Sequence, residues 1–453
     1  MMKKKIYLFT WLFLIIHGVH CLAQEGTSSM KKISAELLRK DFLLLRESLS
    51  KNHPGIYRYR TKNEIDHIFD SCMNSIRDSM TVPEFYALTR FAIAGMEDGH
   101  SNCKLPRNVA EDFVSGIPVF PAMVLFINGH AYIFCCKQNP SLAGCEIISI
   151  NNQPCNVIIE KLFGYIPSDA GISSRKNWEL PEFFHLLYYA IYGPQQQFVI
   201  TYKSSDQSIQ KITLRADIIK NIFCENPFPA PGKYLALSYP TSDIAILQVK
   251  TFLDFFLERS GENFYQFLDS AFRDIKTKQA KKLIIDLRRN QGGNDANGAL
   301  LYSFVALKEF KYYKSLETVD RKINVSDDSL LGTLHPQPNR FDGKLFILTD
   351  GRSFSASSEF SSAVKSNHRG LFLGEENGGG YYGNTSGNDS TLVLPNTQIN
   401  CRVPLVKYTL DVRDLPKHSL GILPDFPLYP SMQDIIAKKD GVILLAIAFA
   451  QKN

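Results

Sequence analysis

Several features that mark common protein classes are missing from this chain of 453 residues. No two cysteines are spaced as CxxC, which disfavours a cysteine-based metal site. No G-x-S-x-G segment occurs, which argues against a lipase-like esterase of the α/β-hydrolase fold. No basic cluster stands out beyond the N-terminus, so nucleic acid is a poor candidate partner.

The chain also lacks tandem repeats, low-complexity tracts and, after its first residues, any apolar run long enough to cross a bilayer. Hydrophobic residues make up 44% and charged residues 21%, which is typical of a globular chain rather than a disordered one. Because domains usually hold about 100–200 residues, we expect two or three of them.

The N-terminus has the pattern of a signal peptide. Lys3–Lys5 precede the apolar run Ile6–Ile16, and small residues precede a cleavage site after Ala23. A membrane anchor is the alternative, but spanning requires about 20 apolar residues. A lipoprotein at Cys21 is disfavoured because His20 precedes it where a small residue is expected. The sequence therefore predicts export to a periplasmic or extracellular location, with no membrane span after cleavage.

Eight cysteines follow Cys21. An oxidising destination permits disulfides, but the sequence assigns no pairs. Cys135 and Cys136 lie in a strand-like run, where the sequence is equally compatible with buried free thiols and with disulfide bonds.

The pattern of apolar residues changes along the chain and predicts distinct regions. Helical periodicity comes first, then short alternating strands, and finally near-continuous apolar strands followed by helices, as in a parallel α/β sheet. The predicted divisions are a signal peptide (1–23), a helical N-terminal domain (24–105), a β-rich module (117–216) with a helical insert (156–193), an α/β domain (233–430) and a C-terminal helix (431–453).

Within the α/β region, two strands each lead into a loop and then a helix. Leu283–Leu287 is followed by Gly292-Gly293, and Leu345–Leu348 is followed by Ser355 at a predicted helix start. Since parallel strands end at one edge of a sheet, these loops are candidates for a shared site.

Ser355 is the candidate nucleophile. A helix N-terminus offers unpaired N–H groups, here including that of Ala356, to stabilise an oxyanion. The alternative is an ordinary N-cap in a serine-rich stretch. The N–H groups of Gly292 and Gly293 are further oxyanion donors, against the alternative of a flexible turn. His100, on a loop at a predicted helix exit, is the candidate base, although a structural histidine is the default for any single one.

Three segments together resemble peptidase family S41, the tail-specific, C-terminal processing and tricorn-core peptidases. Asp286–Gly293 is similar to the family's D-L-R-x-N-x-G-G strand end, Gly351–Glu359 to its nucleophile turn, and Gly421–Asp425 to its G-[IV]-x-P-D segment. The resemblance implies a catalytic domain of ClpP/crotonase type, with a largely parallel mixed sheet. It also implies a preceding helical domain and a PDZ-like module, whose sheet–turn segment would be Gly144–Asn151.

The family divides by its catalytic base. The tail-specific branch places a lysine 25 residues after the serine, where this chain has Gly380, so the resemblance favours the tricorn-like branch, which uses a histidine. Asp98-Gly99-His100-Ser101 is similar to that branch's block, except that Gly99 replaces a serine. The residue that orients His100 stays open among Asp98, Asp411 and Asp414.

The implied function is that of a serine peptidase acting on peptides or proteins, with Ser355 as nucleophile and His100 as general base. The mechanism needs no cofactor and no metal. The main alternative is a catalytically inactive protein of the same fold that captures peptides by strand addition to its PDZ-like module.

Overall fold

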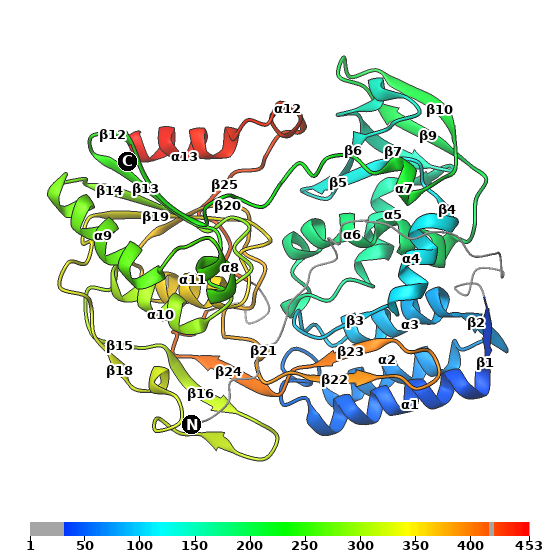
Figure 1. The fold of residues 1–453 in the computed structure, drawn as a ribbon, viewed down its shortest axis with the longest axis horizontal. Helices are drawn as coiled ribbons and strands as arrows, with labels where there is room; N and C mark the ends of the chain where they lie inside the picture. Colours follow the sequence, from blue (N-terminus) through cyan, green and yellow to red (C-terminus); the bar gives the residue numbers. More distant parts are fainter. Residues whose placement is uncertain (1–30, 416–420, 453) are drawn as a thin grey trace.

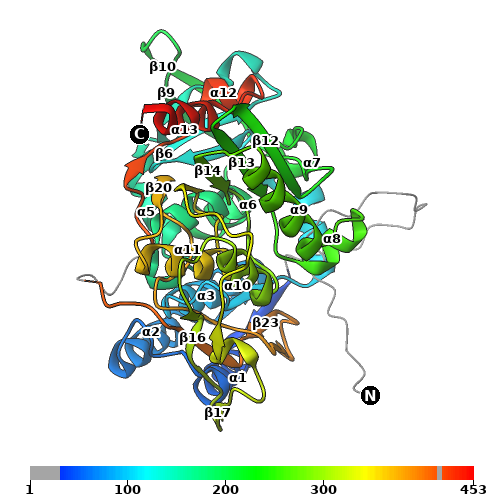
Figure 2. The same ribbon diagram turned by 90° about the vertical axis from the view of Figure 1, so that its left-hand side faces the viewer.

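The structure is a computed structural model that describes residues 31–415 and 421–452. The predicted signal peptide, residues 1–23, lies outside the described residues. The ribbon has two parts, one built from the N-terminal helices and a small β-sheet module, the other from a larger sheet flanked by helices (Figure 1). Figure 2 shows the larger sheet and its helices from the side.

The first region consists mainly of helices. Two of them, α2 and α3, begin with a capping box, formed by Thr61 with Glu64 and by Thr81 with Glu84. The elements are β1 (Lys32–Ser34), α1 (Ala35–Asn52), α2 (Lys62–Asn74), β2 (Ser79–Thr81), α3 (Val82–Ala94), β3 (Asn102–Lys104) and α4 (Arg107–Gly116).

The second region contains one sheet with the strand order β10-β9-β7-β6-β5, in which the short β8 also pairs with β7 and α6 lies against the edge strand β5. A disulfide joins Cys135 on β6 to Cys224 in the segment that leads to the next region, while Cys136 is a free buried thiol. The elements are β4 (Pro118–Val119), β5 (Met123–Ile127), β6 (His130–Cys135), β7 (Glu146–Ile150), β8 (Gln153–Pro154), α5 (Cys155–Phe163), α6 (Ser173–Tyr192), β9 (Gln197–Lys203), β10 (Ile209–Arg215), β11 (Asp217–Ile218) and α7 (Ile219–Ile222).

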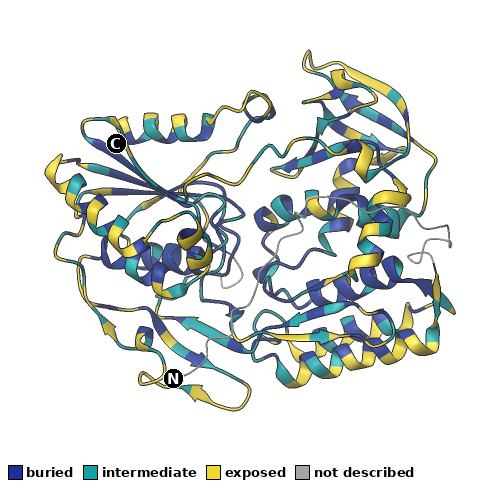
Figure 3. Ribbon diagram, in the orientation of Figure 1, coloured by how far each residue is buried: buried dark blue, intermediate teal, exposed yellow. Residues whose placement is uncertain are grey.

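The third region is a six-stranded sheet of order β12-β13-β14-β19-β20-β25, parallel except for the edge strand β12. Alternate residues of its strands pack on opposite faces of the sheet. Leu247 and Ile285 pack against α9, α10 and α11 on one face, and Ile246 and Ile284 pack against α13 on the other. The elements are β12 (Leu235–Thr241), β13 (Ile244–Val249), α8 (Asp254–Arg259), α9 (Phe264–Thr277), β14 (Lys282–Asp286), α10 (Asp295–Ser303), β19 (Lys344–Thr349), α11 (Ala356–Ser366), β20 (Leu371–Gly374) and β25 (Phe426–Pro427). Burial on both faces explains the near-continuous apolar runs of these strands (Figure 3).

Segments inserted in this region build further small sheets. One hairpin, β22–β23, pairs through β23 with β3, so the C-terminal half of the chain completes a sheet beside the N-terminal helices. The elements are β15 (Phe310–Lys311), β16 (Tyr313–Glu317), β17 (Lys322–Ile323), β18 (Thr333–Leu334), β21 (Thr385–Ser386), β22 (Ser390–Val393), β23 (Asn400–Val403) and β24 (Val406–Leu410).

The C-terminal segment forms two helices, α12 (Met432–Ile436) and α13 (Gly441–Lys452), where the sequence predicted one over 431–453. Lys438, with φ of 55°, breaks the helix between them, and Asp440 accepts a hydrogen bond from the Ile443 N–H at the start of the second. Within residues 31–415 and 421–452, we find no helix with the length and apolarity needed to cross a membrane.

Candidate active site

Ser355 lies in a sharp turn between β19 and α11. Its φ of 56° and ψ of −130° fall in a region that L-residues rarely adopt. The turn is fixed on both sides, because the Ser353 hydroxyl donates to the Leu287 carbonyl (2.9 Å) and the Phe354 N–H donates to the Asn290 carbonyl (3.0 Å). Ser355 is partly exposed whereas Phe354 and Ala356 are buried, so the strained turn presents its hydroxyl-bearing residue toward solvent.

The paired glycines lie directly beside this turn. A Cβ on Gly292 would stand 2.7 Å from the Ser355 Cβ and 2.9 Å from the Ala356 nitrogen, and its φ of 88° already favours glycine. The Gly292 N–H donates to the Asn290 side chain (2.9 Å). The glycine loop pairs with Phe252 through two main-chain hydrogen bonds, in which the Phe252 N–H donates to the Gly292 carbonyl and the Asn294 N–H donates to the Phe252 carbonyl. The Gly293 N–H takes no part in this pairing.

His100 is placed against the same turn from the other part of the molecule. Its ring stacks on Phe354, the residue before Ser355, with centroids 4.4 Å apart and an interplanar angle of 28°. The side chain is buried, and neither ring nitrogen has a hydrogen-bond partner within the described part of the chain. Burial, followed by the charge of Arg402, lowers the pKa of His100 to about 3, so the ring is neutral.

Asp98 holds the main chain around His100 rather than its ring. Its carboxylate accepts hydrogen bonds from the His100 N–H (3.0 Å), from the Ser101 hydroxyl (2.9 Å) and from His53. Burial opposes ionisation, but the His53 charge and hydrogen bond outweigh it and lower the pKa of Asp98 to about 2.

The other two candidates for orienting His100 are less favourably placed. Asp411 and Asp414 follow β24 and are exposed, whereas the His100 ring is buried. A carboxylate that orients a buried imidazole must itself reach the buried side of the ring.

A second carboxylate near His100, that of Asp169, was not predicted from the sequence. Asp169 is buried and accepts hydrogen bonds from the Gly99 N–H (2.8 Å) and the Gly380 N–H (3.1 Å). Burial, and then the negative charge of Asp98, raise its pKa to about 7. Asp169 lies in a short 3₁₀ turn (Asp169–Gly171) inside the predicted insert 156–193, where no motif marks it.

Asp98, His100 and Asp169 each bring one side-chain N or O atom to within 4.8 Å of the other two, a spacing that invites a metal ion. Both carboxylates, however, already accept hydrogen bonds from protein donors, and Arg175 and Arg402 add positive charge beside His100. The residues present therefore fit a metal poorly.

Gly380, which stands where the other branch of the family has its lysine, has no room for a side chain. A Cβ there would lie 2.2 Å from the Tyr59 hydroxyl. The preceding Gly378 donates its N–H to the Ser353 carbonyl (2.9 Å), so this glycine loop also packs on the Ser355 turn.

A buried polar network lies behind the nucleophile turn. The Tyr313 hydroxyl lies 2.7 Å from a Glu359 oxygen and 3.0 Å from an Asp295 oxygen, and the Asn384 amide donates to Glu359 (2.7 Å). Burial, then the charge of Asp295, raise the pKa of Glu359 to about 8, so one proton is retained there at neutral pH. The network ties α10 and α11, which follow the glycine loop and Ser355.

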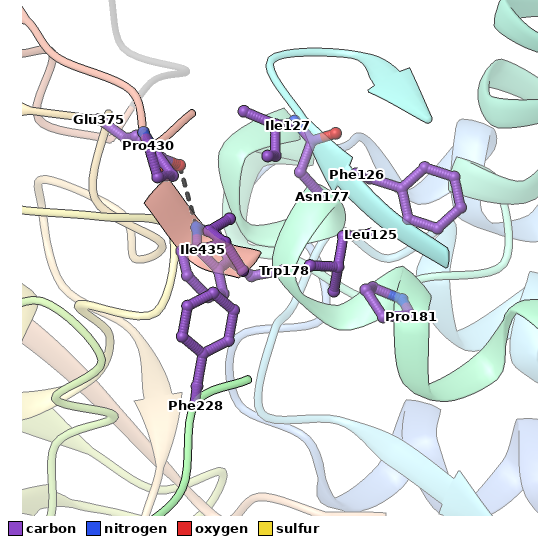
Figure 4. A pocket seen from close by; sticks show the side chains of 10 residues that line it. All are labelled: Leu125, Phe126, Ile127, Asn177, Trp178, Pro181, Phe228, Glu375, Pro430 and Ile435. Carbon is purple, nitrogen blue, oxygen red and sulfur yellow. Dashed lines mark hydrogen bonds between the residues drawn. The ribbon is translucent and has the colours of Figure 1, made fainter. Parts of the chain in front are cut away.

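An apolar pocket lies elsewhere, between the β-rich module and the larger sheet (Figure 4). Trp178 on α6 crosses it and donates from its indole nitrogen to Glu375 (3.0 Å). Neither Ser355 nor His100 is among its lining residues. Its lining is Leu125, Phe126, Ile127, Asn177, Trp178, Pro181, Phe228, Glu375, Pro430 and Ile435.

Comparisons with known proteins bear on this arrangement. Residues 243–428 match the family model of Peptidase family S41. The chain is similar in fold to mature CPAF complexed with lactacystin, at 13% identity over 91% of this chain and 97% of that chain, with a TM-score of 0.63. It is also similar in fold to mature CPAF, at 14% identity over 89% of this chain and 94% of that chain, with a TM-score of 0.62. A putative peptidase from Parabacteroides merdae has a lower TM-score of 0.46, at 16% identity over 92% of this chain and 97% of that chain.

No curated protein matches the sequence significantly. The family match covers both strand–loop–helix units, including the Gly292-Gly293 loop and the Ser355 turn. Residues 243–428 are therefore a region of peptidase family S41, and the chain is a serine-type peptidase.

Proposed function

We propose that the chain is an exported peptidase that cleaves peptide bonds through an acyl-enzyme on Ser355, with His100 as general base. The observation that carries this proposal is the strained, partly exposed turn at Ser355. The contact of this turn with Gly292 supports it, because the glycine loop then lies directly beside Ser355 and the Ala356 nitrogen.

In the proposed reaction, the Ser355 hydroxyl attacks the carbonyl carbon of the substrate and passes its proton to a ring nitrogen of His100. The Ala356 N–H and the Gly293 N–H stabilise the negative oxygen of the tetrahedral intermediate. When the C–N bond breaks, His100 returns the proton to the leaving amine. Water, deprotonated by His100, then releases the acyl group and restores the serine.

The rival proposal is an inactive peptide-binding protein of the same fold. The unpartnered ring of His100 favours it, because a working base is normally oriented by a hydrogen bond to its second nitrogen. A catalytic hydrogen bond is nevertheless often long in a substrate-free enzyme.

Hydrolysis of a quenched-fluorescent peptide library by the purified chain separates the two. We expect turnover that is lost in Ser355→Ala and retained in Ser357→Ala, a matched control in the same helix whose hydroxyl is buried and unpartnered. Equal activity in Ser355→Ala and the parent chain, or no turnover by a folded parent chain, would contradict the proposal.

The export part of the proposal has its own test. N-terminal sequencing of the protein recovered from the periplasm or medium should begin at Gln24, directly after the predicted cleavage site. A mature chain that still begins at Met1 would contradict cleavage.

A further inference from the structure

We propose that Asp169 is the positioning residue of His100: its carboxylate holds the imidazole by a hydrogen bond and stabilises the imidazolium that forms during catalysis. The inference rests on the proposed roles of Ser355 and His100. It assigns the orienting carboxylate to the helical insert of the β-rich module rather than to the catalytic region.

Proximity is the first support. One carboxylate oxygen of Asp169 and one ring nitrogen of His100 lie within 4.8 Å of each other in a buried cluster. Neither ring nitrogen has a hydrogen-bond partner among the described residues, so both remain available to a carboxylate. Catalytic hydrogen bonds are often long in a substrate-free enzyme and shorten when substrate binds.

The second support is that the competing carboxylate is occupied. Asp98 accepts three hydrogen bonds, from His53, Ser101 and the main chain of His100, and none of them goes to the ring. Asp169 accepts two, both from main-chain N–H groups, which leaves acceptor positions on its oxygens.

The third support is where the carboxylate is anchored. Its two hydrogen bonds come from Gly99, the neighbour of His100, and from Gly380 in the glycine loop that packs on the Ser355 turn. A Cβ on Gly99 would stand 2.9 Å from the Phe354 ring and 3.2 Å from the Asp169 nitrogen. Asp169 therefore joins the histidine loop to the nucleophile side of the site.

Charges around the pair define how it titrates. Asp98, Arg58 and Tyr59 face Asp169, while Arg402, Asp98, Arg175 and His53 face His100. Burial, then Asp98, raise the pKa of Asp169 to about 7, whereas burial, then Arg402, lower that of His100 to about 3. Asp169 is therefore mainly protonated below about pH 7 and mainly ionised above it, and only the ionised carboxylate can stabilise an imidazolium. Activity should consequently rise with pH through about 7.

The test uses the full chain and a fluorophosphonate probe, whose rate of reaction with Ser355 reports the base without requiring a known substrate. Asp169→Asn keeps one acceptor for the glycine N–H groups but cannot carry the negative charge. We expect labelling to slow by about 10²-fold or more, with loss of the rise near pH 7 and partial recovery in Asp169→Glu.

Asp41→Asn is the matched control. Asp41 lies on α1, is as buried as Asp169 and accepts hydrogen bonds from Asn396 and Thr397. None of these residues is assigned a role in the reaction. We expect it to lower the melting temperature while the labelling rate of the folded fraction is unchanged. A melting curve for each variant separates loss of fold from loss of positioning.

The two proposals fail in different ways. Labelling of Ser355 that is unaffected by Asp169→Asn, or that keeps its pH dependence in this variant, would overturn the positioning role alone. Labelling that is abolished by chelation and restored by Zn²⁺ would also overturn it, because Asp169 would then be a metal ligand. A folded parent chain without labelling at Ser355 would overturn the proposed function itself.

Discussion

Phe354 and Gly292 show how single residues shape the site. The Phe354 ring stacks on His100, and the guanidinium carbon of Arg175 lies 4.1 Å from the ring centroid, so one aromatic residue joins the histidine loop, α6 and the nucleophile turn. Gly292 lets the second loop approach the same turn at a distance that no side chain permits. At this scale, the chemistry depends on close contact between backbones.

Substitution of Gly292 by alanine tests this dependence. The added Cβ would clash with the Phe354 carbonyl and the Ser355 Cβ, both 2.7 Å away, and would displace the loop that presents the Gly293 N–H. We expect kcat to fall by about 10²–10³, as on loss of an oxyanion donor. Gly261→Ala is the control, because its φ of 69° is equally unfavourable but its Cβ meets nothing within 4 Å. Unchanged kcat in Gly292→Ala would refute the role of the loop.

Residue types in short motifs could be predicted, whereas their partners could not. Ser355, the paired glycines and His100 could each be found from the local sequence around them. In the structure, the glycines and His100 lie around the Ser355 turn. Asp169 was missed, because its role depends on contacts with Gly99 and with Gly380, which is 211 positions away. No local pattern encodes such a contact.

At the scale of elements, a buried ion network fixes the end of β14, just before the glycine loop. Asp286 is fully buried and accepts from Lys250 (2.7 Å) and Arg288 (2.8 Å), and Arg288 also binds Asp440 at the start of α13 (2.7 Å). The network ties the strand that leads into the glycine loop to the helix on the opposite face of the sheet.

Lys250→Met tests the contribution of this network. The substitution leaves Asp286 with one cation in place of two, and we expect a loss of about 3 kcal/mol in the free energy of unfolding. Urea denaturation measures it. Lys438→Met, which removes the exposed pair with Glu225, should leave the urea midpoint unchanged. Equal midpoints for Lys250→Met and the parent chain would show that the network contributes nothing.

Elements with a strong local pattern were predicted well. The apolar runs Leu283–Leu287 and Leu345–Leu348 lie within one residue of the observed strands β14 and β19 at each end. The C-terminal region forms two helices where one was predicted, because the helix breaks at Lys438, and the turn signal Asp440-Gly441 stands directly after this break. The PDZ-like character of 117–216 and the domain limits stay predictions.

At the scale of the whole molecule, several carboxyl groups are buried in a way that favours their neutral form. Burial raises the pKa of Asp169 and Glu182 to about 7 and that of Glu359 and Glu375 to about 8. A group whose pKa is higher in the folded state than in the unfolded state stabilises the fold at low pH. That contribution is lost as the pH rises through the folded-state pKa.

We therefore expect the melting temperature to fall between pH 6 and pH 9, the window set by these pKa values of about 7 and about 8. Differential scanning calorimetry at both pH values measures the change. Glu359→Gln and Glu375→Gln should each reduce the slope, because an amide does not ionise. A melting temperature that rises over this window would contradict the assignment of raised pKa values.

The arrangement of the whole chain was also only partly predictable. The sequence indicated a parallel sheet from two strand–loop–helix units, but not that β23 would pair with β3, the strand that follows His100. This pairing joins residues about 300 positions apart, and no local sequence pattern encodes such a contact.

The most direct test of the account is covalent labelling of the intact protein by a fluorophosphonate, followed by mass spectrometry of the whole chain and of its peptides. We predict one adduct per chain, on Ser355, that is absent from Ser355→Ala, unchanged in Ser357→Ala and formed far more slowly in His100→Ala. A folded protein that forms no adduct, or that carries the adduct on a different serine, would contradict the assignment of Ser355 as the nucleophile.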